Sequence, residues 1–166
     1  MTTTPICWTT YVSPLGPLTL HGGPDGLTAL EFPGDGAPRD EAARAPDLFA
    51  EAVAQLDAYF AGELRRFDLE LDLRGTPFQL DVWQRLLEIP CGETTSYGAL
   101  ARALGRPDGV RAVGAAVGRT PVPIIVPCHR VVASDGKLTG YRGGLERKRA
   151  LLALEARSGG ASGRVH

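Results

Sequence analysis

Cysteine is scarce in this sequence, with only three among 166 residues: Cys7, Cys91 and Cys128. One of them stays unpaired whatever the other two do, and none belongs to a CxxC or Cys/His cluster with zinc spacing. We therefore expect neither a disulfide framework nor a bound metal.

Long apolar runs are missing as well. No stretch approaches the ~20 consecutive apolar residues of a membrane-spanning helix, and residues 1–12 lack the basic start and apolar core of a secretory signal. We expect no membrane association and a cytoplasmic location, or a nuclear one in a cell with a nucleus. The composition, 43% hydrophobic and 22% charged, excludes disordered, collagen-like and coiled-coil proteins.

Basic residues are rare in the first half of the chain and common in the second. Residues 1–75 hold 12 Asp and Glu against five Arg, a net charge of −7, whereas residues 76–166 hold seven acidic and 13 basic residues, a net charge of +6. This asymmetry indicates that the second half faces a polyanion. The alternative is chance segregation of solvated surface charge.

The first half reads as a small antiparallel sheet followed by one helix. Residues 8–12, 17–21 and 27–32 are typical of strands, with Pro24-Asp25-Gly26 as a turn, and residues 33–46 read as a loop. Apolar side chains from Phe49 to Phe60 recur at helical spacing after Asp47, a candidate N-cap, and Gly62 ends the run. Residues 67–73 alternate apolar and acidic side chains, which predicts a surface strand.

The second half begins with a clear helix start, because Thr76, Pro77 and Gln79 make a capping box with proline at the first helical position. Further helices are predicted from the cap Ser96 to Gly105 and over residues 109–118. Two short helices joined by a glycine-containing turn fit a helix-turn-helix, an arrangement also found in domains that bind no DNA.

The predicted helix over residues 109–118 has one apolar face. Val110, Val113 and Val117 stand at helical spacing and should face the core. The opposite face would then be small and basic, with Arg111, Gly114, Ala115 and Gly118. Such a face suits close approach by a large partner, although tight helix packing within the domain would explain it equally well.

Residues 121–132 contain the residues best suited to chemistry. A run of apolar residues and prolines, which predicts a strand, delivers Cys128, His129 and Arg130 in succession, and a second strand follows up to a turn at residues 134–137. A base and a cation beside a thiol lower its pKa and produce a nucleophile, whereas an isolated apolar cysteine is usually inert. Neighbours in a strand point to opposite sides, so Cys128 and His129 would need a bridging water or a local turn to interact.

A carboxylate is needed to orient the imidazole of such a pair. Glu155 ends a predicted helix over residues 145–155 and is one candidate. Glu146 and Asp135 are its rivals, and the sequence alone does not decide among them.

The second half resembles the O6-alkylguanine-DNA alkyltransferases, also called methylated-DNA-protein-cysteine methyltransferases. The similarity covers almost all of residues 76–155 with constant spacing. It rests on PCHRVV at 127–132, PVPI at 121–124, LTGY at 138–141, GGL at 143–145, TPFQ at 76–79, VW at 82–83, IP at 89–90, GET at 92–94, SY at 96–97 and RAVG at 111–114.

The resemblance implies DNA repair by direct reversal of damage. An alkyl group would pass, once and irreversibly, from O6-alkylguanine in double-stranded DNA to Cys128, with O4-alkylthymine as a further candidate substrate and no cofactor. It assigns Cys128 as acceptor, His129 as its base, Glu155 as the orienting carboxylate and Tyr97 as proton donor to the leaving guanine. It implies minor-groove binding by a monomer, with Arg111 filling the stack where the base is flipped out. Further DNA contacts are Ala112, Gly114, Ala115, Ser96 and Thr94, and the pocket residues are Tyr141, Val131, Ser134, Asp135 and Pro123.

The implied fold class is α+β with two domains. Residues 1–75 would form a ribonuclease-H-like domain of antiparallel sheet and helix, similar mainly through residues 13–16. Residues 76–157 would form the mainly helical DNA-binding and catalytic domain with the helix-turn-helix. Residues 158–166, rich in Gly and Ser, are expected to be a flexible tail.

Three positions depart from the family pattern. Thr120 stands where Asn usually precedes Pro-Val-Pro, Arg142 replaces a smaller residue, and Thr4, Gly23 and Thr28 occupy the region of the zinc ligands of some eukaryotic members. Alternative functions are a noncatalytic lesion-binding protein, in which tryptophan replaces the acceptor cysteine, a transcriptional regulator using residues 96–118, and a Cys-His hydrolase. Cys128 argues against the first of these.

Overall fold

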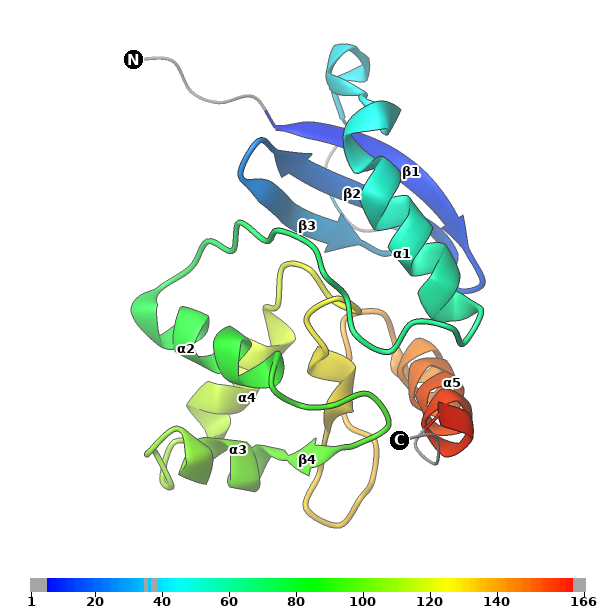
Figure 1. Ribbon diagram of the computed structural model, residues 1–166. Helices are drawn as coiled ribbons and strands as arrows, with labels where there is room; N and C mark the ends of the chain where they lie inside the picture. Colours follow the sequence, from blue (N-terminus) through cyan, green and yellow to red (C-terminus); the bar gives the residue numbers. More distant parts are fainter. Residues whose placement is uncertain (1–5, 35, 37–38, 163–166) are drawn as a thin grey trace.

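The computed structural model describes residues 6–34, 36 and 39–162, the last four of these by their backbone alone. The first half contains an antiparallel sheet in the order β1 (Cys7–Ser13), β2 (Gly16–Gly23) and β3 (Gly26–Glu31). Helix α1 (Ala50–Phe60) packs beside the sheet (Figure 1). The predicted meander and the helix that follows it are therefore confirmed.

Three details of the first half differ from the prediction. Asp47 does not cap α1, because a 3-10 turn over Pro46–Phe49 precedes the helix and begins at the proline. Another 3-10 turn, Glu41–Ala43, interrupts the predicted loop. Residues 67–73 do not form a strand, since they pair with β3 only at the bridge between Leu27 and Leu71. The segment passes so close to Gly26, which has a φ of 128°, that a Cβ there would lie 2.5 Å from the carbonyl oxygen of Glu70.

The second half is mainly helical, with α2 (Pro77–Leu86), α3 (Tyr97–Ala103), α4 (Val110–Gly118) and α5 (Leu145–Ser162). The predicted capping box of Thr76 and Gln79 is present in full, and the Ser96 side chain caps α3. Strands β4 (Thr95–Ser96) and β5 (Val131–Val132) pair in parallel. This pairing fixes the start of α3 next to the segment that carries Cys128.

The predicted strand over residues 121–130 is wrong. Cys128–Arg130 form the 3-10 turn η3, and the strand β5 begins only at Val131. Every residue from Val122 to Arg130 is buried, with Ile124 at a φ of 76°. This segment is a buried loop between the sheet and the helices. At its start, the amide of Leu30 in β3 donates a hydrogen bond to the carbonyl of Pro121.

The C-terminal segment also differs from the expectation. Helix α5 continues past Glu155 to Ser162 and includes most of the predicted tail. Residues 163–166 lie outside the described part of the chain.

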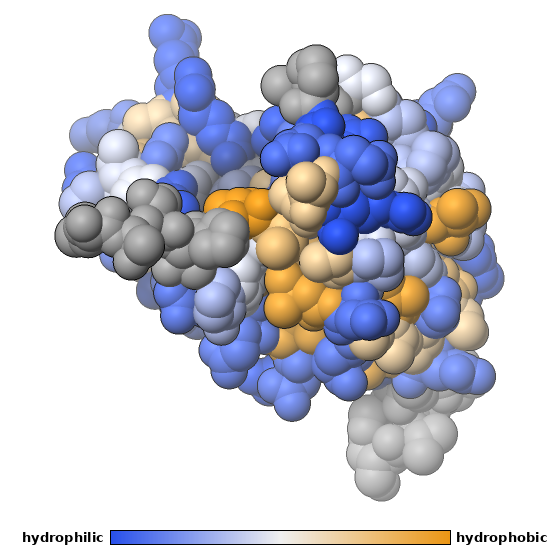
Figure 2. Space-filling model, turned by 90° about the horizontal axis from the view of Figure 1, so that it is seen from above, coloured by the Kyte–Doolittle hydropathy of each residue, from blue (hydrophilic) through white to orange (hydrophobic). Residues whose placement is uncertain are grey.

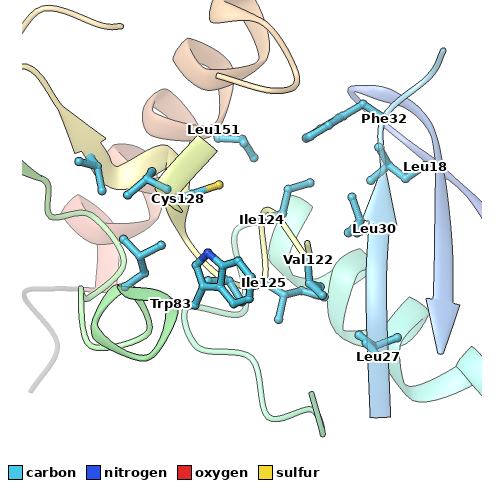
Figure 3. Packing of buried hydrophobic residues seen from close by; sticks show 14 of the residues in the cluster. Leu18, Leu27, Leu30, Phe32, Trp83, Val122, Ile124, Ile125, Cys128 and Leu151 are labelled. Carbon is cyan, nitrogen blue, oxygen red and sulfur yellow. The ribbon is translucent and has the colours of Figure 1, made fainter. Parts of the chain in front are cut away.

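One hydrophobic core joins the two halves. Figure 3 shows side chains of the sheet, such as Leu18 and Leu30, in one cluster with Trp83 of α2 and Ile124 of the buried loop. Viewed from above, the molecule is largely polar, with a smaller group of apolar residues near the centre of this face (Figure 2). None of the described helices is long and apolar enough to cross a bilayer.

Candidate active site

A pocket of about 480 Å³ opens beside Cys128. Helices α3 and α4 and the loop before α5 form its walls, and the nearly buried Cys128 belongs both to the pocket lining and to the core. The lining residues are Tyr97, Val110, Gly114, Val117, Gly118, Thr120, Cys128, Thr139, Gly140, Tyr141 and Arg142. Cys128, Tyr97 and Tyr141, which the sequence predicted for the catalytic site and its pocket, lie together here. Gly114, predicted as a DNA contact, lines the same pocket.

The turn η3 places His129 away from the pocket and against α5. Its Nε2 lies 2.6 Å from Oε2 of Glu155, and both side chains are fully buried. The rival carboxylates, Glu146 and Asp135, are exposed. The structure therefore selects Glu155 as the partner of His129.

Glu155 is the centre of a buried hydrogen-bond network. Arg130 donates through Nε to Oε1 and through Nη2 to Oε2, each at 2.8 Å, and the hydroxyl of Tyr59 donates to Oε2 at 2.6 Å. Burial alone would raise the pKa of Glu155, but the hydrogen bonds and positive charges of His129 and Arg130 outweigh it and bring the pKa well below its usual range. Glu155 is therefore ionised at neutral pH.

The imidazole of His129 is neutral, and its tautomer follows from Glu155. Burial lowers the pKa of His129, and Glu155 opposes this while Arg130 and Lys148 add to it. Because an ionised carboxylate only accepts hydrogen bonds, Nε2 carries the proton. The buried Nδ1 has no hydrogen-bond partner among the described residues, so its lone pair can receive a proton.

The expectation that Arg130 lowers the pKa of Cys128 is wrong, because the guanidinium is turned to Glu155 and to the Ile89 carbonyl. Burial raises the pKa of Cys128 to about 11, although the nearby Thr120 side chain and the charge of Lys148 oppose the rise. The resting form at neutral pH is a thiol. A nucleophile must be generated by removal of its proton.

We expect the reaction of Cys128 with iodoacetamide to follow this pKa. In the free protein the modification rate should climb with pH up to about 11, because only the thiolate reacts. Peptide mass spectrometry of samples quenched at intervals from pH 6 to pH 11 would give the rate at Cys128. A rate that is already constant above pH 7 would show that the site holds a thiolate.

Sequence reasoning missed Lys148. This fully buried side chain donates from Nζ to the carbonyls of Val131 at 2.7 Å and Thr139 at 3.1 Å, and burial lowers its pKa. It thereby ties β5 to the pocket loop. The signal was its position seven residues before Glu155, which puts both on the same face of the helix.

Two tyrosines, Tyr97 of α3 and Tyr141 of the pocket loop, are held in place by contacts at the pocket. Thr139 Oγ1 donates to the hydroxyl of Tyr97 at 3.2 Å. The ring of Tyr141 lies edge-on to Phe32 and His129, and its hydroxyl is buried without a hydrogen-bond partner among the described residues. Both rings are therefore fixed at the wall of the pocket.

Other predicted pocket residues lie elsewhere. Val131 and Pro123 are buried, and Ser134 and Asp135 lie on an exposed turn. None of the four lines the pocket. Thr120, whose hydroxyl donates to the Val117 carbonyl at 2.7 Å, does line it.

The orientation of α4 is partly as predicted. Arg111, Ala112 and Ala115 are exposed, and Gly114 is half-buried. Val110 is wrong as a core residue, since it is exposed at the pocket rim. Ala116 takes its place, because the helix starts at Val110 and its middle packs on α2, where Trp83 Nε1 donates to the Ala116 carbonyl. Thr94 is exposed and Ser96 half-buried at the start of α3.

No group of three or more His, Cys, Asp or Glu side chains is placed to hold a metal ion within residues 6–34, 36 and 39–162. Gly23 and Thr28, from the region compared with zinc-binding relatives, lie in β2 and β3. Thr4 is outside the described residues.

Comparison with known proteins shows the family to which this chain belongs. Residues 77–157 match the family model described as 6-O-methylguanine DNA methyltransferase, DNA binding domain, and residues 6–73 match its ribonuclease-like domain. A methylated-DNA--protein-cysteine methyltransferase of Mycobacterium tuberculosis is 55% identical, covering 90% of this chain and 92% of the relative. One of Methanosarcina acetivorans is 48% identical, covering 87% and 95%.

Solved structures extend the similarity to the fold. The O6-methylguanine methyltransferase of Mycobacterium tuberculosis superposes with a TM-score of 0.86 at 52% identity, covering 93% of this chain and 94% of the other. Mycobacterium tuberculosis OGT in complex with DNA gives 0.83 at 54% identity, covering 91% and 93%. An α+β fold with a ribonuclease-like first half and a DNA-binding second half is thus confirmed, and the chain belongs to the 6-O-methylguanine DNA methyltransferase family.

Proposed function

We propose that this protein repairs DNA by direct reversal, moving the alkyl group of O6-alkylguanine onto its own Cys128. The observation that carries the proposal is a thiol at the pocket wall whose neighbour His129 is neutral, oriented by Glu155 and open to a proton at Nδ1. A relative named methylated-DNA--protein-cysteine methyltransferase, 55% identical over 90% of this chain, supports the proposal.

The chemistry follows from these groups. His129 Nδ1 takes the thiol proton, with one water as the bridge, and Sγ attacks the alkyl carbon while the carbon–O6 bond breaks. Tyr97 supplies a proton to the departing guanine and regains one from His129, so the thiol proton ends on guanine. The product is a thioether. Nothing among the lining residues can hydrolyse it, so each molecule reacts once.

The pocket walls suit an extruded purine. Flipped bases are held by stacking and by contacts to their edges, and Tyr97, Tyr141 and the small residues Gly114 and Gly118 offer a flat, open slot. Arg142 lines the same pocket and replaces the smaller residue of some relatives, so contacts near the alkylated oxygen involve a guanidinium here.

Helix α4 links DNA docking to this pocket. Its exposed face holds Arg111, Ala112 and Ala115, and its next turn lines the pocket through Gly114 and Gly118. We infer that α4 lies in the minor groove and that Arg111 fills the gap left by the flipped base. Thr94 and Ser96 stand at the start of α3, where backbone phosphates would pass.

The assembly and location follow from the same site. One chain supplies every group that the transfer uses, so a monomer is the expected active form. A substrate in DNA supports a cytoplasmic location, or a nuclear one in a cell with a nucleus.

The function is tested by counting repaired bases. A duplex carrying one O6-methylguanine, incubated with increasing protein and digested to nucleosides, should lose one O6-methylguanine and gain one guanine per protein molecule. Repair of many bases per molecule, or loss of the modified base without return of guanine, would refute direct reversal.

The docking surface makes a separate prediction. Ala115→Glu should abolish duplex binding, measured by fluorescence anisotropy, because bulk and negative charge enter the face that approaches phosphates. The fold should be kept, since Ala115 is exposed. Ala54→Glu places the same change on an exposed position of α1 in the acidic half and should leave binding unchanged. Normal repair by Ala115→Glu would show that α4 does not dock on DNA.

A further inference from the structure

Among the described residues that donate to Glu155, Tyr59 alone comes from the first half of the chain. It lies on α1, is 1% exposed, and donates its hydroxyl hydrogen to Glu155 Oε2 at 2.6 Å. The same oxygen receives the Nε2 hydrogen of His129, also at 2.6 Å. Arg130 Nη2 donates to it as well, at 2.8 Å, so three donors from the two halves of the molecule share one carboxylate oxygen.

The position of the Tyr59 hydroxyl is fixed by packing. Its ring lies 5.1 Å from the ring of Phe67 and 5.2 Å from that of Phe60, the latter edge-on. Burial and the negative charge of Glu155 raise the pKa of Tyr59 far above its usual value. The phenol thus stays protonated and can only act as a donor toward Glu155.

We propose that Tyr59 is a positioning residue of the transfer site, through which the first half of the chain sets how strongly Glu155 supports a proton on His129. The hydroxyl takes up part of the charge on Oε2 and so weakens the carboxylate as a partner for a positively charged imidazole. It also limits rotation of the carboxylate, which Arg130 holds through both oxygens, so that Oε2 stays within reach of His129 Nε2.

The direction of the effect follows from every group that faces His129. Glu155 of α5 favours an imidazolium, whereas Arg130 of η3 and Lys148 of α5 disfavour it; the Tyr141 ring stands edge-on at 6.5 Å. The hydroxyl dipole of Tyr59 points its positive end at the shared oxygen and acts in the same sense as the two cations. Removing it should raise the pKa of His129.

The inference rests on the proposed role of His129 as the base, because a base must be unprotonated to act. The transfer rate should accordingly fall on the acidic side as His129 is protonated. A higher pKa for His129 moves this acidic limb to higher pH, so the loss of rate grows as the pH falls and is small near pH 8.

The test compares Tyr59→Phe with the wild type in two measurements. NMR titration of the His129 ring should show its pKa raised by about one unit, and the acidic limb of the transfer rate should move up by the same amount. Tyr11→Phe is the matched control, because Tyr11 is also a mostly buried tyrosine that donates to a carboxylate, Asp57 of α1, at 2.7 Å. It should move neither quantity.

A second variant that keeps the hydroxyl makes the test independent of whether Tyr59→Phe folds normally. Site-specific 3-fluorotyrosine at position 59 is a stronger donor of similar size and should shift the titration of His129 in the opposite direction. If Tyr59→Phe lowers the rate equally at all pH values and neither variant moves the titration of His129, Tyr59 is only structural and the inference is overturned. The titration is independent of transfer, so a wild type without activity would refute the proposed function and leave this test intact.

Discussion

Cys128→Ser is expected to show no methyl transfer at all, while its affinity for duplex DNA stays within about twofold of the wild type. A serine hydroxyl loses its proton far less readily than a thiol, and the neutral His129 cannot remove it at a useful rate. The side chain lines the pocket and is absent from the exposed face of α4, so docking should be unaffected. Transfer is measured with a labelled methyl group and binding by anisotropy.

Cys7→Ser is the control for this substitution. Cys7 is half-buried in β1, in the acidic half of the molecule, and its loss should leave transfer unchanged. Label that appears on Cys7 or Cys91 in the Cys128→Ser protein would contradict the assignment.

Glu155→Gln should have the second large effect, on both stability and transfer. The change leaves the buried Arg130 without its carboxylate and His129 without an ionised acceptor. Breaking a buried ion pair from one side costs about 3–5 kcal/mol of unfolding free energy. Urea unfolding monitored at pH 7 measures it. The transfer rate should fall as well, because the imidazole is no longer held in the Nε2-protonated form.

Glu146→Gln separates this network from a general effect of charge on α5. Glu146 is exposed at the first turn of the same helix, and its substitution should change stability by less than about 0.5 kcal/mol. Equal losses of unfolding free energy in the two variants would show that the contacts of Glu155 with His129 and Arg130 add nothing to stability.

The contribution of Glu155 to stability should depend on pH in a definite direction. The pKa of Glu155 is lower in the folded protein than in the unfolded chain. Its contribution is therefore fully present above the ordinary carboxyl pKa and is lost as pH falls through the lower folded value. The destabilisation caused by Glu155→Gln should accordingly be constant from pH 6 to pH 8 and shrink only in strong acid.

Local signals in the sequence predicted the elements that local interactions determine. The capping box at Thr76, the Ser96 cap and the three strands of the sheet each depend on residues close together in the chain. The run Cys128-His129-Arg130, to which we assign the transfer, was likewise visible as contiguous residues.

Features that depend on packing between distant segments were missed. Residues 121–130 look like a strand because they are apolar, yet they are buried on all sides by the sheet and the helices, so neither strand pairing nor alternation applies. Tyr59 reads as one more apolar residue of α1, and only the folded chain brings it to Glu155, 96 residues away. The pKa of Cys128 could not be read from neighbours in sequence, because burial outweighs them and Arg130 points elsewhere.

The central claim, that Cys128 accepts the alkyl group once and permanently, is tested most directly by intact-protein and peptide mass spectrometry. The protein is incubated with an excess of duplex carrying O6-methylguanine with a ¹³C-labelled methyl group. The account predicts a gain of one labelled methyl per chain, located on the peptide that contains Cys128, with no loss on prolonged incubation. Label on any other residue, more than one label per chain, or repaired guanine without label on the protein would contradict it.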